Sequence, residues 1–257
     1  MAAGRTFWEW VEYIIARYSG WFVTGACNTM LIALTSTLIG LLIGIIVAVI
    51  RTIPRGHNDP LIKKGFLGVI NFLLAAYVEI FRGTPMMVQA IIVYYGLMEA
   101  YRIDLAPIPA GILVVSINTG AYMAEIVRGG IESIDRGQFE AAHSIGMTHW
   151  QTMVNIILPQ AIRNILPATG NAFVINIKDT SVLNVISVSE LFFMFKSVSG
   201  VIYRFFEASL VTCAIYFVLT FTVTRILRAI EKKMDGPPNY VMGGEARRRP
   251  RFGGWRA

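Results

Sequence analysis

Five long apolar runs, separated by short polar connections, constrain the fold of this chain more than any other feature of its sequence. A helix needs about 20 apolar residues to cross the roughly 30 Å hydrocarbon core of a bilayer, and each run is long enough. The runs cover residues 21–50, 66–98, 107–127, 165–188 and 205–227. Charged residues make up only 15% of the chain, well below the roughly 25% of ordinary soluble domains. This composition excludes a disordered chain, a soluble nucleic-acid-binding protein and a disulfide scaffold, and it predicts an all-α membrane protein.

The second run is interrupted by Glu79, by Arg82 and by the helix-breaking sequence Gly83-Thr84-Pro85. Its length, from 66 to 98, is too short for two full spans and the turn between them. We therefore interpret it as one broken span, which gives five transmembrane helices in total.

The Lys and Arg residues of the connections predict the orientation of these helices. With five spans, sixteen of the basic residues fall on one side of the membrane and five on the other. The basic side comprises segments 51–64, 128–163 and 225–257, and the opposite side comprises 1–20, 99–106 and 190–204. Because cytoplasmic connections are enriched in Lys and Arg, we expect the amino terminus outside and the carboxyl terminus in the cytoplasm. The net charge of +7 therefore reports topology rather than binding to nucleic acid.

Three regions follow from this pattern. Residues 1–20 are rich in Trp and Tyr and are expected to form an amphipathic helix at the membrane interface. Residues 21–230 form the transmembrane domain, which includes a cytoplasmic segment at about 133–163. Residues 231–257 form a basic cytoplasmic tail. The two cysteines, Cys27 and Cys213, lie inside apolar runs and are predicted to be free, buried thiols.

Motifs for catalysis or for cofactor binding are missing from the sequence. No Lys follows a Gly, so the chain has no phosphate-binding G-x-x-x-x-G-K-[ST] loop, and it has no G-x-S-x-G sequence. The residues His57, His143 and His149 do not have the i, i+4 spacing of a helical metal pair. The sequence therefore predicts a chain with no catalytic residue, no cofactor and no metal of its own.

The 133–163 segment carries two helix-start signals. Asp135 is followed three residues later by Gln138, and Thr148 by Gln151, which is the spacing of a capping box. These signals predict two short helices that meet at Gly146, the first over about 137–145. Either a docking helix for a partner protein or a surface helix on the lipid headgroups would fit this pattern.

This first helix carries Glu140, Ala141 and Ala142, and three residues separate Ala142 from Gly146. Together with Ile156-x-Leu158-Pro159, this spacing resembles the E-A-A-x3-G-x9-I-x-L-P signature of permease subunits of ATP-binding-cassette importers. Three further stretches resemble motifs of the polar amino-acid permeases within that group, which serve histidine, arginine, glutamine and glutamate. They are residues 81–85 with Gln89, residues 121–131, and Lys178-Asp179-Thr180-Ser181.

The resemblance implies a five-helix permease of the type I importer fold in a bacterial cytoplasmic membrane. Its expected partners are a separate ATPase subunit that uses the ATP, an extracytoplasmic substrate-binding protein, a second permease copy (identical or not) and membrane lipid, with no nucleic acid. The mechanism would be alternating access. It also implies that Glu140, Ala141, Ala142 and Gly146 contact the ATPase.

Polar residues inside the spans are candidates for the substrate path, because burying them in lipid is costly. The stretch from Lys178 to Ser181 lies about halfway along the fourth run and offers an acceptor for an ammonium group and a donor for a carboxylate. The same two charges could instead pair with each other, or across a dimer, merely to satisfy burial. Further candidates are Glu79 and Arg82, which could neutralise each other across one helical turn, and Asn118.

Two structural expectations concern the first and third runs. Glu125 is expected to anchor the cytoplasmic end of the third span near Arg128. Gly40 and Gly44 form a small-xxx-small pair, which permits close helix packing.

Two rival functions make different predictions. A secondary transporter driven by an ion gradient would show inverted repeats with paired broken helices, and no such repeat is visible in the sequence. An intramembrane enzyme would need a catalytic constellation, which the sequence does not contain.

Overall fold

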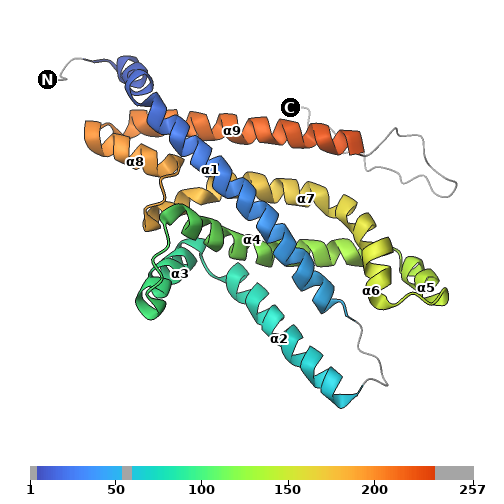
Figure 1. The fold of residues 1–257 in the computed structure, drawn as a ribbon. Coiled ribbons are helices and arrows are strands. Elements are labelled where there is room, and N and C mark those ends of the chain that lie inside the picture. Colours follow the sequence, from blue (N-terminus) through green and yellow to red (C-terminus); the bar gives the residue numbers. More distant parts are fainter. Residues whose placement is uncertain (1–4, 54–59, 235–257) are drawn as a thin grey trace, which may run out of the picture.

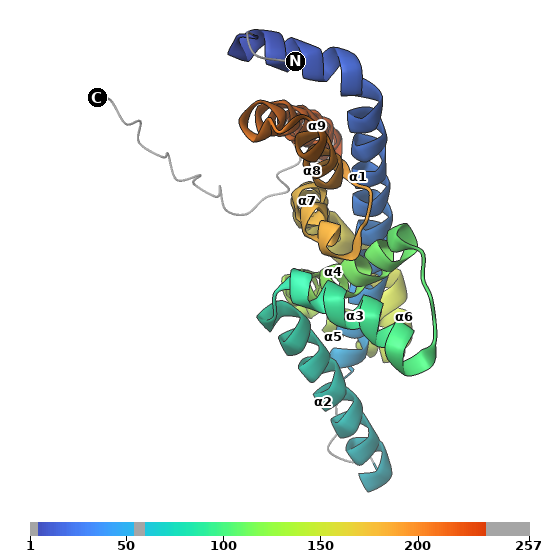
Figure 2. The same cartoon turned by 90° about the vertical axis from the view of Figure 1, so that its left-hand side faces the viewer.

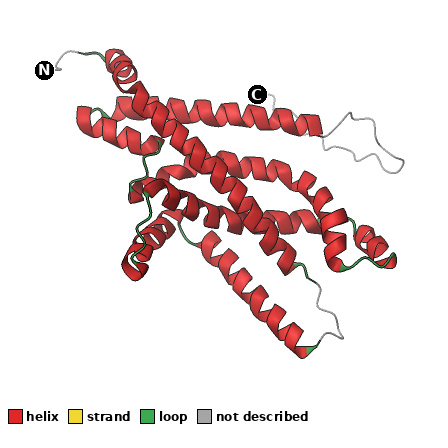
Figure 3. Ribbon diagram, in the orientation of Figure 1, coloured by secondary structure: helices red, strands yellow, loops and turns green. Residues whose placement is uncertain are grey.

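The structure is a computed structural model that describes residues 5–53 and 60–234, and within these residues it contains helices and no strand (Figures 1 and 3). The α-helices are α1 (Phe7–Arg51), α2 (Leu61–Gly83), α3 (Met86–Tyr101), α4 (Pro107–Glu132), α5 (Arg136–Ser144), α6 (His149–Thr152), α7 (Leu158–Asp179), α8 (Leu191–Ile202) and α9 (Phe205–Met234). A π-helical turn, η1 (Met153–Ile157), joins α6 to α7, and a 3-10 helix, η2 (Thr180–Ile186), follows α7. The expected basic tail lies outside the described residues after position 234.

Helix α1 is longer than the first apolar run. It starts at a capping box in which the Thr6 hydroxyl accepts from the Glu9 backbone N–H and the Glu9 carboxylate accepts from the Thr6 N–H. Residues 7–20 of the region expected as a separate helix over 1–20 are instead the first part of this one helix, which bends sharply and then runs past the other helices (Figure 2). Its position at the membrane interface stays a prediction.

Within residues 5–53 and 60–234, four helices are long and apolar enough to cross a membrane: α1, α2, α4 and α9. A fifth span results if the helical stretch His149–Ile186 and α8, which are bent by 54° relative to each other, count as one broken crossing. The expected break at Thr84-Pro85 is present, and it separates α2 from α3. However, α2 meets the requirements of a span by itself, so α3, with 16 residues, is not needed to complete the second crossing.

The crossing of α1 over α4 is the most extensive helix contact in the fold, and glycines make it possible. A Cβ atom added at Gly40 would lie 2.8 Å from the Cβ of Thr119, and one added at Gly44 would overlap Met123. Because real Cβ atoms do not approach so closely, the two helix backbones can meet only at glycine. The close packing expected of the Gly40–Gly44 pair is confirmed.

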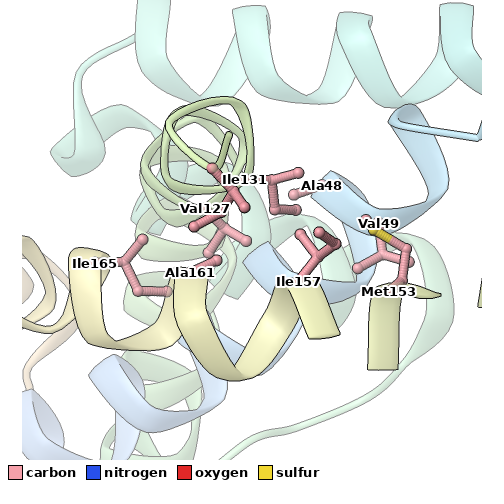
Figure 4. Packing of buried hydrophobic residues seen from close by; sticks show 9 residues of the cluster. Ala48, Val49, Val127, Ile131, Met153, Ile157, Ala161 and Ile165 are labelled. Carbon is pink, nitrogen blue, oxygen red and sulfur yellow. The ribbon is translucent and has the colours of Figure 1, made fainter. Parts of the chain in front are cut away.

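A hydrophobic cluster connects the spans to α5 and to the π-helical turn η1. It joins the ends of α1 and α4 to η1 and to the start of α7 (Figure 4), and Phe139 of α5 packs against it. Its labelled members are Ala48, Val49, Val127, Ile131, Met153, Ile157, Ala161 and Ile165. Since close-packed interiors transmit displacement, a movement of α5 would reach three spans.

A buried polar contact fixes α7 against α1 and α4. The amide nitrogen of Asn176 donates to the hydroxyls of Thr37 (2.8 Å) and Thr119 (3.1 Å). All three residues are buried, and the amide satisfies the two hydroxyl oxygens. This contact positions the α7 face that lines the cavity described below.

The two cysteines are free, as expected, but both are exposed at the surface of this chain. The expectation of buried thiols is therefore wrong. An apolar run indicates that its residues belong to a membrane-spanning helix. It does not indicate which face of that helix packs against other helices.

Candidate functional site

A cavity of about 440 Å³ lies between the start of α3, the middle of α4 and the last turns of α7. Its polar lining consists of Thr84, Asn118, Tyr122, Asn171 and Asp179, together with Thr119 and Asn176 at its buried wall. We call it the Asp179 cavity. Of the residues that the sequence proposed for the substrate path, it brings together Asn118 and Asp179.

The wall of this cavity at the α2–α3 break is held by two amide side chains. Gln89 donates to the carbonyl oxygens of Phe81 and Thr84, both at 3.0 Å, and Asn118 donates to Phe81 O (3.0 Å) and to Gln89 Oε1 (2.9 Å). A helix end leaves its last carbonyl oxygens without partners, and these amides satisfy them. The donors of Asn118 are thus committed to the break, which makes it a positioning residue of this wall.

Arg82 lies over the ring of Tyr122, with its guanidinium carbon 5.5 Å from the ring centroid. Because Tyr122 lines the Asp179 cavity, this contact places a cation at the rim of that cavity. The sequence suggested that Arg82 and Glu79 neutralise each other, but no ion pair joins them within 60–234, where both are described. Glu79 is exposed on α2 and does not line the Asp179 cavity.

Lys178 and Asp179 do not share one site. They lie in the last turn of α7, directly before η2 and near the middle of the broken crossing that runs from His149 to Ile202. Asp179 lines the Asp179 cavity, whereas Lys178 and Ser181 line a second cavity of about 370 Å³ between α7, η2, α8 and α9. Consecutive helical residues point about 100° apart, which explains the separation. Thr180 is buried, and its hydroxyl donates to Ile177 O at 3.0 Å, which is a structural role.

Glu190 is a buried carboxylate that the sequence analysis missed. It is fully buried and starts α8, where it accepts from the N–H groups of Phe192 (2.8 Å) and Phe193 (2.7 Å) and from the Tyr216 hydroxyl (3.0 Å). It thereby joins α8 to α9. An acidic residue directly before an apolar helix was the available signal, because a carboxylate can cap a helix start.

The 133–163 segment folds as expected in most respects. Helix α5 covers Arg136–Ser144, and the capping box of Thr148 with Gln151 at the start of α6 is confirmed. Asp135 caps α5, but through the N–H of Gly137 (2.6 Å) instead of a reciprocal box with Gln138. Gly146 joins the helices with a φ of 82°, a conformation that favours glycine.

The side chains of α5 divide between two faces. Glu140 and Ala141 are exposed, whereas Ala142 is 1% exposed and packs inside this chain. The implied contact of Ala142 with the ATPase stays a prediction, although its side chain already packs inside this chain. Glu140 and Ala141 lie on a face that is open to another protein.

A charge cluster ties the ends of α1 and α4 near α5. Glu125 accepts from Arg51 at 2.7 Å and from Arg128 at 2.8 Å, and Arg128 also pairs with Glu132. The expected position of Glu125 beside Arg128 is confirmed. Since the cluster bridges two closely packed helices, it fixes their relative position at this end of the fold.

Comparison with protein families gives one match over most of the chain. Residues 64–236 match the family described as binding-protein-dependent transport system inner membrane component. The probable amino-acid permease protein YxeN of Bacillus subtilis is 36% identical over 218 residues, which cover 84% of this chain and 96% of the relative. The glutamine transport system permease protein GlnP of Escherichia coli K12 is 35% identical over 216 residues, with 82% and 92% covered.

Solved structures show the same arrangement of helices. One chain from the crystal structure of an amino acid ABC transporter with histidines superposes with a TM-score of 0.73 at 36% identity, over 85% of this chain and 96% of that one. An inward-facing MetNI methionine ABC transporter matches with a TM-score of 0.63 at 18% identity, over 81% and 95% of the two chains, a likeness in fold.

Proposed function

Because this chain belongs to the family of inner-membrane components of binding-protein-dependent transport systems, we propose that it is the permease subunit of an ATP-driven importer of polar amino acids. Relatives named as amino-acid, glutamine and arginine permeases support the substrate class. The chain forms a translocation path with a second permease copy. A separate ATPase hydrolyses the ATP, and an extracytoplasmic binding protein delivers the substrate.

The observation that carries this proposal is the charge arrangement around the Asp179 cavity. Its carboxylate can accept from the ammonium group that every amino acid carries, and Arg82 at the rim can donate to a carboxylate. The cavity volume of about 440 Å³ lies within the range typical of small-molecule sites. A zwitterion needs both charges, and the two elements that supply them, α7 and the α2–α3 break, are packed against the same helix, α4.

The proposed contact with the ATPase is the exposed face of α5 with Glu140 and Ala141, together with the turn at Gly146. Phe139 of the same helix packs against the cluster that joins α1, α4 and α7. A displacement imposed on α5 by ATP binding would therefore reach α7, which carries Asp179. Alternating access follows if that displacement changes which end of the Asp179 cavity is open.

The proposal is tested by Asp179→Asn, which removes the anionic acceptor but preserves the shape of the side chain. A charge-assisted hydrogen bond contributes about 1.5–3 kcal/mol. We therefore expect the apparent affinity of uptake to fall about ten- to a hundredfold in cells that express the complete transporter. The matched control is Asp104→Asn in the exposed connection between α3 and α4. Uptake of labelled amino acids and the amount of assembled complex are measured together.

If Asp179→Asn transports with unchanged affinity, the Asp179 cavity is not the substrate path. If the variant loses assembly as well as uptake, Asp179 has a structural role instead.

A further inference from the structure

We call the second cavity the Lys178 cavity; it is lined by the end of α7, by η2, by α8 and by the first turns of α9. Helix α8 lies at the opposite end of the fold from α5 and α6 (Figure 1). The cavity has a volume of about 370 Å³, which is sufficient for a small molecule. Its lining includes Lys178, Ser181, Phe192, Ser209, Thr212 and Tyr216.

Lys178 has no carboxylate partner among the residues that the structure describes. Lys178 is not among the cations of the ion pairs between described residues, which include Arg51, Arg128 and Arg204. The adjacent carboxylate, Asp179, faces the other cavity. An ammonium group within a membrane-spanning segment is costly unless an anion or water accompanies it.

The buried carboxylate next to this cavity already has three hydrogen-bond donors. Glu190 accepts from two backbone N–H groups and from the hydroxyl of Tyr216, which is itself part of the cavity lining. It forms no ion pair with Lys178. Because the side chain of Lys178 is exposed, an anion from outside the chain can approach it.

A second ammonium group is connected to the cavity lining through hydrogen bonds. Lys196 of α8 donates to Asn184 Oδ1 at 3.3 Å, and Asn184 Nδ2 donates to Ser181 O at 2.7 Å. Ser181 lines the cavity together with Lys178. Two cations thus flank one turn, η2, which raises the local preference for an anion.

The other polar groups of the cavity suit the second charge of a zwitterion. The hydroxyls of Ser209 and Thr212 donate to carbonyl oxygens of their own helix, Phe206 O and Ala208 O, both at 2.8 Å. With their protons used in this way, the hydroxyl oxygens are left as acceptors. The wall can therefore accept from an ammonium group while Lys178 donates to a carboxylate.

We propose that the Lys178 cavity is a second binding site, which takes the carboxylate of an amino acid before the molecule reaches the Asp179 cavity. This inference rests on the proposed import of amino acids. The two cavities are lined by neighbouring residues, Lys178 and Asp179, which lie on different faces of the end of α7. The phosphate of a lipid headgroup can also accept from an ammonium group. The experiment therefore distinguishes an amino-acid carboxylate from a lipid phosphate.

The test is lysine acetylation of the purified full-length chain in nanodiscs, with each lysine quantified by mass spectrometry. An equimolar pool of the twenty standard amino acids should protect Lys178 from the reagent, and the individual amino acid responsible is then found by deconvolution. The amine that this amino acid yields on loss of its carboxylate should not protect. Because the added amino acids and the amine also consume the reagent, the acetylation of Lys178 is expressed relative to that of Lys232, which is exposed at the end of α9. Protection is a fall in this ratio.

Several outcomes would overturn the inference. Protection that depends on phosphatidylglycerol in the nanodisc, and not on amino acids, would make a lipid the occupant. Equilibrium dialysis of the labelled pool with the same nanodiscs separates this inference from the proposed function. If the chain retains amino acids while Lys178 stays unprotected, only the second site is wrong; if it retains none and Lys178 is unprotected, both proposals fail.

A pair of variants gives an independent measurement in the complete transporter. Lys178→Gln should weaken the apparent affinity of uptake about ten- to a hundredfold, because it removes a charge-assisted hydrogen bond, whereas Lys178→Arg should retain most of it. Equal uptake affinity in the wild type and in Lys178→Gln would contradict the site.

Discussion

At the scale of single residues, Gly146 is the position where one backbone angle decides the geometry of the 133–163 segment. Its φ is 82°, and an added Cβ would meet no atom within 4 Å, so only the backbone conformation opposes a side chain there. Gly146→Val should raise the conformational energy of this turn by about 1–3 kcal/mol. It should therefore lower the ATP hydrolysis that the loaded binding protein stimulates. Gly146→Asn should retain most of this activity, because Asn tolerates positive φ. Full stimulation in the Val variant would show that the turn does not set the ATPase contact.

The neighbouring alanines of α5 are expected to respond differently to the same substitution. Ala142 is buried in this chain, so Ala142→Trp should destabilise the fold itself, with overpacking costs of about 1–3 kcal/mol or more. Ala141 is exposed, so Ala141→Trp should leave the thermal stability of the isolated permease unchanged and weaken its binding to the ATPase. Thermal unfolding and co-purification of the ATPase distinguish these effects. A stable Ala142→Trp variant would contradict the packing described for α5.

At the scale of helices, the crossing of α1 and α4 depends on Gly44. An added side chain would overlap Met123, so Gly44→Leu should separate the two helices and lower the midpoint of thermal unfolding by several degrees. The control is Gly68→Leu on α2, where nothing lies within 4 Å of the added Cβ. Size-exclusion profiles and unfolding midpoints in detergent measure both. Equal midpoints for the two variants would show that the α1–α4 contact contributes little to stability.

Sequence patterns predicted the helices with their caps, breaks and turns, because these features depend on residues that are near in sequence. The apolar runs, the break at Thr84-Pro85, the capping box at Thr148 and the turn at Gly146 are features of this kind. The Gly40 and Gly44 spacing also indicated a close contact, although not its partner helix.

The composition of the site could not be predicted in the same way, because it depends on which face of each helix meets another. Lys178 and Asp179 are adjacent in sequence, yet α4 packs on one side of them and α8 and α9 on the other. The burial of Ala142 depends likewise on packing with distant residues. Glu190 lacked an obvious partner in the sequence, since Tyr216 follows it by 26 residues.

At the scale of the whole molecule, the orientation in the membrane is a prediction that rests on the distribution of basic residues. A cysteine introduced by Asp104→Cys should react with a membrane-impermeant thiol reagent added to whole cells, and one introduced by Arg136→Cys should not. Because Cys27 and Cys213 are exposed, both are first replaced by Ser. The reverse labelling pattern would invert the topology and place α5 outside the cell.

The energy source for transport is the central claim of this account, and reconstituted transport tests it most directly. The chain is reconstituted into proteoliposomes with its ATPase subunit, with ATP enclosed and the loaded binding protein outside. We expect labelled amino acid to accumulate inside the proteoliposomes, on the side that holds ATP, only when ATP is hydrolysed. This accumulation should continue when ionophores collapse the proton and sodium gradients. Accumulation that needs an ion gradient and proceeds without ATP would contradict the account and identify a secondary transporter.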